Sequence, residues 1–224
     1  MQDVKLYTYY RSSAAYRVRI ALNIKVIAYQ AEYIHLLKDG GQVNTAEYQQ
    51  INPQKLLPSY REGDDIFTQS LAIIEYIDET HPSPPLLPSS ALDRAFVRSL
   101  ALSIACDIHP LDNLRVLKYL QNKLNIDKKD RDCWYCHWIQ EGFTALETRL
   151  RQNNVNRKSE SSDYCFGKQV TLADICLIPQ VYNAIRFKCV LNNYPIINSI
   201  YNNCMKLPAF QQASPEQQVD FVEN

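Results

Sequence analysis

A proline- and serine-rich run, PSPPLLPSS, divides the sequence at residues 82–90. Before it, short runs of β-branched and aromatic residues alternate with helical patterns, and after it strand patterns nearly vanish. Such a run is typical of a linker between compact units. We therefore expect an α/β domain over residues 1–82, a linker over 83–90 and an all-helical domain over 91–224.

The first domain is expected to hold a mixed sheet. The order strand, helix, strand, helix, strand, strand, helix is predicted over residues 4–9, 14–23, 28–35, 45–50, 56–60, 66–68 and 71–80. A helical crossover makes the first two strands parallel, and a hairpin at residues 62–65 makes the last two antiparallel. Pro58 inside a strand indicates an edge, a bulge or a cis peptide bond. On the first helix, the apolar stripe includes Val18 and Leu22, and Arg17 and Arg19 fall off it.

The second domain is expected to be helical throughout. Helical patterns cover residues 91–105, 111–124, 130–152, 171–185 and 195–206. The polar stretch 153–163 is expected to be a loop. The polar tail after Pro208 is expected to lie on the surface.

Charge and composition exclude several classes of function. Lys+Arg and Asp+Glu are 24 each, and this balance argues against nucleic-acid binding and against a polybasic membrane anchor. Only five glycines are present, and neither a dinucleotide-binding fingerprint nor a P-loop occurs. We find no secretory signal pattern and no run of about 18 apolar residues. We expect a soluble, cytoplasmic protein.

The seven cysteines do not have the spacing of a disulfide scaffold, and we expect them to be reduced. Cys133-Trp-Tyr-Cys136-His137 could serve redox or zinc chemistry, but no second ligand pair accompanies it. We expect two ordinary helix residues there, one buried and one not, and no metal site. The first 105 residues contain no cysteine. Sulfur chemistry in the first domain would therefore need a thiol brought by a ligand.

Two expected helix starts in the first domain carry serines. Arg11, Ser12 and Ser13 precede the first helix, and Gln69 and Ser70 precede the third. Free backbone N–H groups at such starts favour an anion, and a nearby thiolate would be stabilised. The simpler alternative is that each serine caps its helix. At either helix start taken alone, the cap is favoured. Two such starts in one small domain indicate an anion-binding site more specifically than either start does alone.

The run from Thr171 to Asp174 matches a capping box before an apolar helix, so we interpret both residues as structural. His109 and Arg186 are isolated polar residues of the second domain. A lone histidine is usually structural or solvated, and a lone arginine is usually a surface charge.

Four segments together resemble the zeta-class glutathione transferases. They are YRSSAAYRVRIALN, NPQKLLPSY, FTQSLAIIEYIDE and VTLADICLIPQVYNAIRFK. The resemblance covers nearly the whole chain. It implies a thioredoxin-like first domain that binds glutathione, an all-helical second domain and a homodimer. The implied activity is the glutathione-dependent isomerisation of maleylacetoacetate to fumarylacetoacetate in tyrosine and phenylalanine breakdown.

The resemblance also implies roles for individual residues. Ser12 matches the serine that activates the glutathione thiol, and Ser13 lies in the same catalytic loop. Arg11 and Arg186 are candidates for binding the substrate carboxylates. The residues matched to glutathione binding are Arg17, Gln42, Leu57, Pro58, Gln69, Ser70, His109, Asn113, Leu114 and Arg115.

Two departures from the family pattern stand out. Ala14 replaces a cysteine that is common in the motif, and His109 stands where glutamine is common. The serine mechanism is unaffected by Ala14, whereas the glutathione contact at His109 departs from the family pattern. Three alternatives stay open: maleylpyruvate isomerisation, a general transferase or dehalogenase acting on small halo-acids, and a non-catalytic binding module.

Overall fold

The computed structural model describes residues 4–156 and 162–223. The chain forms two compact units. The first runs up to Pro85 and also takes in the chain from Lys206 onward, and the second spans Leu86–Met205. The sequence-based boundaries differ, because they assigned the C-terminal segment to the helical domain.

The first unit is built on a four-stranded mixed sheet. Its strands are β1 (Val4–Thr8), β2 (Gln30–Tyr33), β3 (Ser59–Glu62) and β4 (Asp65–Thr68), in the spatial order β2-β1-β3-β4. β1 pairs in parallel with β2, and both β1–β3 and β3–β4 are antiparallel. The predicted mixed sheet is confirmed. Strand β3 begins only at Ser59, after a cis peptide bond between Leu57 and Pro58.

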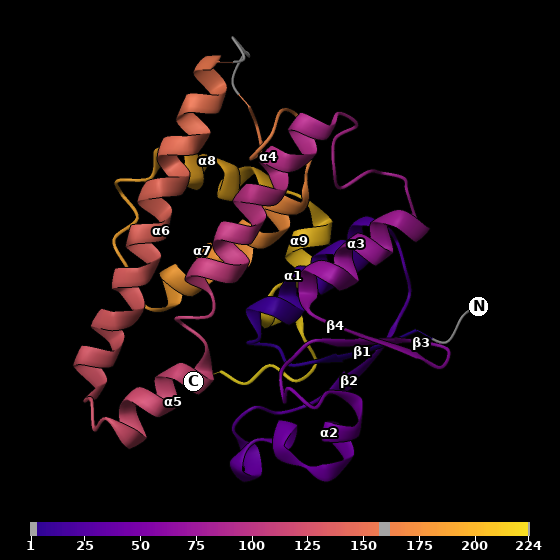
Figure 1. Cartoon of the computed structure of the whole chain (residues 1–224), viewed down its shortest axis with the longest axis vertical. Helices are drawn as coiled ribbons and strands as arrows, with labels where there is room; N and C mark the ends of the chain where they lie inside the picture. The colour runs from indigo at the N-terminus through magenta and orange to yellow at the C-terminus, as the bar shows by residue number, and fades with distance from the viewer. Residues whose placement is uncertain (1–3, 157–161, 224) are drawn as a thin grey trace. The chain divides into compact units, whose positions relative to one another are not determined.

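Three helices accompany this sheet. They are α1 (Ser13–Ile24), α2 (Ala46–Ile51) and α3 (Ser70–Thr80), and short 3₁₀ turns cover Lys38–Gly40 and Gln42–Asn44. Helices α1 and α3 lie on one side of the sheet and α2 lies on the other (Figure 1). The stripe containing Val18 and Leu22 is fully buried, as predicted. Arg17 and Arg19 are also buried, which the apolar pattern did not predict.

The C-terminal segment belongs to the core of the first unit, so the prediction of a surface tail is wrong. Helix α9 (Pro208–Ala213) packs against α1, and Phe210 is fully buried. The Nε of Arg19 donates to the Ala213 carbonyl at 3.0 Å, and the Tyr16 hydroxyl donates to the Phe210 carbonyl at 3.3 Å. Only Phe210 and Ala213 of this helix are buried, and a six-residue segment is too short to show a helical period in the sequence.

A buried lysine fixes the end of the first unit. The Nζ of Lys25 lies 2.6 Å from an Asp78 carboxylate oxygen and also donates to the carbonyls of His81 and Pro84. Its three N–H donors are therefore matched by three acceptors, as a buried ammonium group requires.

The second unit is helical in its described part. Its helices are α4 (Ala91–Leu102), α5 (Leu114–Lys123), α6 (Lys128–Asn156), α7 (Leu172–Arg186) and α8 (Pro195–Cys204). A π-helical segment, Ser103–Ile108, follows α4, where the sequence predicted a continuous α-helix. Twelve of the fifteen residues of α7 are buried, so this helix forms the centre of the unit.

Helix α6 extends to Asn156, beyond the predicted helix end at residue 152. The expected loop at 153–163 is therefore wrong over its first residues, and residues 157–161 lie outside the described part of the chain. Within the described residues, the structure has no helix that is both long and apolar enough to cross a membrane.

Candidate functional site

The strand register brings three loops of the first unit to one end of the sheet. Tyr7 on β1 is paired with Ser59, and Ser59 is also paired with Thr68 at the end of β4. The end of β1, the start of β3 and the end of β4 therefore lie side by side. The chain enters α1 from the first, reaches the second through Leu57-Pro58 and enters α3 from the third. Sequence segments up to 60 residues apart thus meet at one edge.

Ser12 is the N-cap of α1, as the simpler alternative predicted. Its Oγ accepts the Ala15 N–H at 3.2 Å, and its carbonyl accepts the Tyr16 N–H at 2.8 Å. No acceptor for the Ser12 hydroxyl proton is found among the described residues. The cap uses the lone pairs of the oxygen and leaves its O–H free to donate. Capping and donation to an anion are therefore compatible at this serine.

The main-chain N–H and C=O of Leu57 have no hydrogen-bond partner among the described residues. Its side chain is packed in an aromatic cluster that includes Tyr9, Tyr10 and Tyr48. The preceding carbonyl, that of Leu56, accepts from the Tyr48 hydroxyl at 2.7 Å and from the Asn52 amide at 2.8 Å. A fixed backbone with two unpaired polar groups is suited to pairing with another peptide.

Helix α3 starts without a side-chain cap. Its N-cap is Gln69, which has a positive φ of 70° and makes no capping hydrogen bond, so the prediction that Ser70 caps the helix is wrong. Ser70 is the first helical residue, is buried, and accepts from Nη1 of Arg17 at 3.3 Å. The first-turn N–H groups of α3 and a buried guanidinium thus favour an anion at this position. The Gln69 amide donates to Gln54 Oε1 at 2.9 Å.

The other predicted site residues of the first unit differ in burial and in hydrogen bonding. The Gln42 amide oxygen accepts the His35 N–H at 2.6 Å, so part of this side chain holds its own loop. Ser13 is buried in the first turn of α1. Arg11 is half-buried, and its guanidinium lies 5.8 Å from the Tyr10 ring centre.

Sequence reasoning missed Asp220 near this loop. Its Oδ2 accepts the Tyr10 N–H at 2.9 Å, and the Phe221 ring meets the Tyr10 ring edge-on at 5.5 Å. Burial raises the pKa of Asp220, although the hydrogen bond from Tyr10 opposes the increase. The tail thus fixes the residue that precedes Arg11 and Ser12. No local pattern could have indicated this contact, because the two residues are 210 positions apart.

The burial of Arg19 is explained by its hydrogen bonds within the first unit, without a role in binding a ligand. Besides the Ala213 carbonyl, its guanidinium donates to the Thr8 hydroxyl and to the carbonyls of Tyr9 and Tyr10 at 3.0 to 3.3 Å. Burial lowers the pKa of Arg19 to about 10, which leaves it charged at neutral pH. We interpret this residue as a clamp between β1, α1 and α9.

The remaining predicted residues belong to the second unit. Asn113 caps α5 by accepting the Arg115 N–H at 3.0 Å, and Leu114 is the first residue of that helix. Arg115 is exposed and His109 is half-buried. Arg186 is exposed in the last turn of α7, with its guanidinium 4.6 Å from the Phe187 ring centre.

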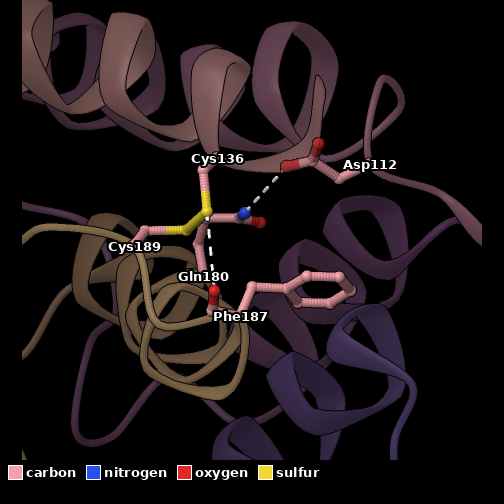
Figure 2. Close-up of a disulfide and its surroundings, with 5 residues drawn as sticks. All are labelled: Asp112, Cys136, Gln180, Phe187 and Cys189. Atoms are coloured by element: carbon pink, nitrogen blue, oxygen red, sulfur yellow. Dashed lines mark hydrogen bonds between the residues drawn. A yellow bond between two sulfur atoms is a disulfide. The ribbon is translucent and has the colours of Figure 1, made fainter. Parts of the chain in front are cut away.

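A buried acid beside Asn113 was also missed. Asp112 is only 5% exposed, its Oδ2 accepts from the Gln180 amide at 3.4 Å, and its Oδ1 has no partner among the described residues (Figure 2). Burial raises the pKa of Asp112 to about 8, and the hydrogen bond from Gln180 opposes the increase. No local pattern indicates this burial, because Asp112 lies in a turn directly before the cap residue Asn113.

Asp174 has the structural role that the capping box predicted. It is fully buried and accepts from the Thr171 N–H and hydroxyl at 2.8 Å each and from the Cys165 N–H at 2.7 Å. These three donors hold the start of α7 in the core of the second unit.

Comparisons with known proteins agree on one family. Residues 6–85 match the glutathione S-transferase N-terminal domain. A probable maleylacetoacetate isomerase of Vibrio cholerae is 47% identical over 220 residues, covering 98% of this chain and 99% of the relative. A holo structure of a maleylpyruvate isomerase, a bacterial zeta-class glutathione S-transferase, superposes with a TM-score of 0.92 at 39% identity, covering 97% of this chain and 100% of that structure.

The chain belongs to the zeta class of the glutathione transferases. A further structure, a maleylacetoacetate isomerase of Methylobacterium extorquens with bound malonate and glutathione, has a TM-score of 0.90 at 35% identity, covering 98% of this chain and 100% of that chain. The expected family and fold are confirmed.

The open groups of the first unit fit glutathione, which is a short peptide with a thiol and two carboxylates. The Ser12 hydroxyl has a proton to donate, Leu57 has a free peptide unit, and the uncapped start of α3 favours a carboxylate. These three features occur together at the sheet end that the strand register defines.

Proposed function

We propose that this zeta-class chain is a glutathione-dependent isomerase that converts maleylacetoacetate into fumarylacetoacetate. When bound, glutathione supplies a nucleophilic thiolate for reversible addition to the cis double bond of the substrate. The observation that carries the proposal is the Ser12 hydroxyl, which caps α1 and still has a proton to donate. Hydrogen bonding to an anionic sulfur favours its ionised form at neutral pH.

The other residues of the first unit are assigned to binding. Gln69, Ser70 and the first-turn N–H groups of α3 hold the γ-glutamyl end of the peptide, and Arg17 supports Ser70 through its hydrogen bond. Leu57 pairs with the peptide through its open main chain, since Pro58 and the Leu56 contacts fix it in place. We assign Ser13 to the catalytic loop and Gln42 to a further glutathione contact.

Residues outside these features are assigned from the resemblance. We assign the substrate carboxylates to Arg11 and Arg186, both of which carry a charge with a solvent-accessible part. Glutathione contacts from the second unit are assigned to His109, Asn113, Leu114 and Arg115. We also propose a homodimer, which sizing with light scattering would report as twice the chain mass of 26.0 kDa, and a cytoplasmic location, which cell fractionation would test.

Maleylpyruvate is the second candidate substrate, because a maleylpyruvate isomerase of the zeta class superposes with a TM-score of 0.92. Its chemistry is the same and its diacid is shorter. The chain's own residues that we assign to substrate, Arg11 and Arg186, would bind the carboxylates of either compound.

The test is isomerisation of both substrates by the purified protein, with and without glutathione. We expect strictly glutathione-dependent turnover and a higher kcat/KM for maleylacetoacetate. A higher value for maleylpyruvate would reassign the substrate and leave the mechanism intact. Retention on immobilised glutathione without isomerisation would contradict the proposal in favour of a transferase or dehalogenase acting on halo-acids, and failure of both would indicate a binding module.

A further inference from the structure

A disulfide joins helix α6 to the turn after α7 in the second unit. Cys136 of α6 and Cys189 in the turn after α7 are bonded across 53 residues, with a Cα–Cα distance of 5.3 Å. The other five cysteines are free. The expectation that Cys136 is an ordinary helix residue and that all the cysteines are reduced is therefore wrong for this pair, because the partner is distant in sequence.

The two bonded cysteines differ in accessibility. Cys136 is half-buried, whereas Cys189 is buried with 9% of its surface exposed. In the dithiol state, a soluble disulfide would therefore reach Cys136 first, and Cys189 would be the enclosed thiol beside it. Cys106 and Cys133 are exposed and free, so they report what a cysteine without such a neighbour does.

The turn that Cys189 closes has a second attachment at the same place (Figure 2). Cys136 Sγ lies 3.6 Å from the carbonyl oxygen of Phe187, and the Phe187 ring stacks on the Tyr135 ring at 3.6 Å. A disulfide sulfur has no proton, but a Cys136 thiol would donate to that carbonyl. Both redox states therefore have a way to hold this turn, one covalent and one through a weak hydrogen bond.

We propose that Cys136 and Cys189 form a thiol–disulfide exchange site that reacts with glutathione disulfide. The Cys136 thiolate attacks one sulfur of glutathione disulfide, forms a mixed disulfide and releases one glutathione thiolate. The Cys189 thiolate then attacks Cys136 Sγ, forms the protein disulfide and releases the second. The two protein thiols are oxidised, glutathione disulfide is reduced to two glutathione molecules, and the two thiol protons go to the released thiolates.

The bond has one consequence that rests on the proposed function. It ties the turn that follows Arg186, the last residue of α7, to α6. We expect the disulfide state to hold Arg186 more firmly. Reduction should then raise the KM for the diacid several-fold and leave kcat nearly unchanged.

The test equilibrates the native chain in buffers of varied glutathione to glutathione disulfide ratio, followed by acid quenching, alkylation under denaturing conditions and peptide mass mapping. We expect Cys136 and Cys189 to lose their thiols together in one two-electron transition without retaining glutathione. Cys106 and Cys133 should instead gain glutathionyl groups. Independent behaviour of Cys136 and Cys189, or free thiols on both at every ratio, would overturn the proposal.

Variants sharpen this test. Cys189→Ser should trap Cys136 as a stable mixed disulfide with glutathione, because no second thiol resolves it, and Cys106→Ser should leave the paired transition unchanged. Wild-type mapping does not depend on the folding of either variant. If the paired transition occurs without any isomerase activity, the exchange site stands and the proposed function fails. If the transition occurs and KM does not move, only the link to Arg186 is refuted.

Discussion

The helix start at Thr171 and the helix start at Ser12 both carry short polar side chains, yet they leave different groups open. At Thr171, the Asp174 carboxylate is fully buried and accepts three hydrogen bonds from its own unit. At Ser12, one N–H is capped and the hydroxyl proton has no acceptor among the described residues. A helix start whose side-chain acceptor is occupied by hydrogen bonds within the protein stabilises the fold. A helix start that keeps an unused hydroxyl proton can donate it to a ligand.

The start of α3 extends this comparison. It has no side-chain cap, and the buried Arg17 donates to its first residue, Ser70. An anionic ligand would accept hydrogen bonds at the start of α3, as the Asp174 carboxylate does at the start of α7. The expected effects of mutation therefore separate, with loss of stability at α7 and loss of chemistry or binding at α1 and α3.

The largest effect should come from Ser12→Ala. Removing one donor to a developing or bound anion costs about 100- to 1,000-fold in turnover, and the lost cap costs only about 1 kcal/mol of stability. Ser90→Ala is the matched control, because the Ser90 hydroxyl caps α4 by accepting the Asp93 N–H at 3.1 Å. Steady-state kinetics and urea unfolding of both variants test this. Equal turnover in the two variants would break the comparison.

Asp174→Ala should chiefly affect folding. It leaves three buried donors without an acceptor, and we expect the free energy of unfolding to fall by about 2–4 kcal/mol, more than a single lost cap. Thr45→Ala removes an exposed cap at α2 and should cost about 1 kcal/mol or less. Chemical denaturation measures both. An Asp174→Ala loss no larger than the Thr45→Ala loss would contradict the structural role.

Asp112 and Asp174 are both buried carboxylates, but Asp112 accepts one hydrogen bond and Asp174 accepts three. Burial raises the pKa of Asp112 from 3.8 to about 8. Between these values the folded state holds a proton that the unfolded state has lost, so stability should fall as pH rises. One proton gives a slope of at most about 1.4 kcal/mol per pH unit.

Asp112→Asn keeps the shape of the side chain and removes the titrating group. We expect its unfolding free energy, measured from pH 4 to 8, to lack the part of the slope that belongs to Asp112. Identical slopes in the variant and the wild type would show that Asp112 is ionised in the folded state.

The smallest effect should come from Ser70→Ala. It removes the hydroxyl that accepts from Arg17 and leaves the backbone N–H groups of α3 in place. Loss of the hydrogen bond between the Ser70 hydroxyl and the charged γ-glutamyl end of glutathione predicts glutathione binding weaker by roughly 10-fold. Isothermal titration calorimetry measures the affinity, with Ser90→Ala again as the control. Unchanged affinity would remove Ser70 from the binding site.

Local patterns predicted the parts of this molecule that depend on neighbouring residues. The apolar stripe of α1, the hairpin after Tyr60 and the capping box at Thr171 each result from chemistry within a few positions, and the structure contains all three. The helix starts at Ser12 and Gln69 were located for the same reason.

The remaining features depend on contacts between distant segments. Arg17 and Arg19 are buried because Ser70 and the chain near Ala213 supply acceptors, and no helical pattern contains those partners. The Cys136–Cys189 disulfide and the contact between Asp220 and Tyr10 likewise join residues 53 and 210 positions apart. The resemblance supplied candidate roles at such positions, and local periodicity could not.

The most direct test of the account is the pKa of the glutathione thiol on the protein, followed by the ultraviolet absorbance of the thiolate across a pH titration. An unperturbed thiol has a pKa of about 8.5. We expect the bound thiol of the wild type to titrate roughly two units lower, and that of Ser12→Ala to return toward the free value while glutathione stays bound. An unshifted pKa in the wild type, or the same low pKa in both proteins, would contradict the role assigned to Ser12.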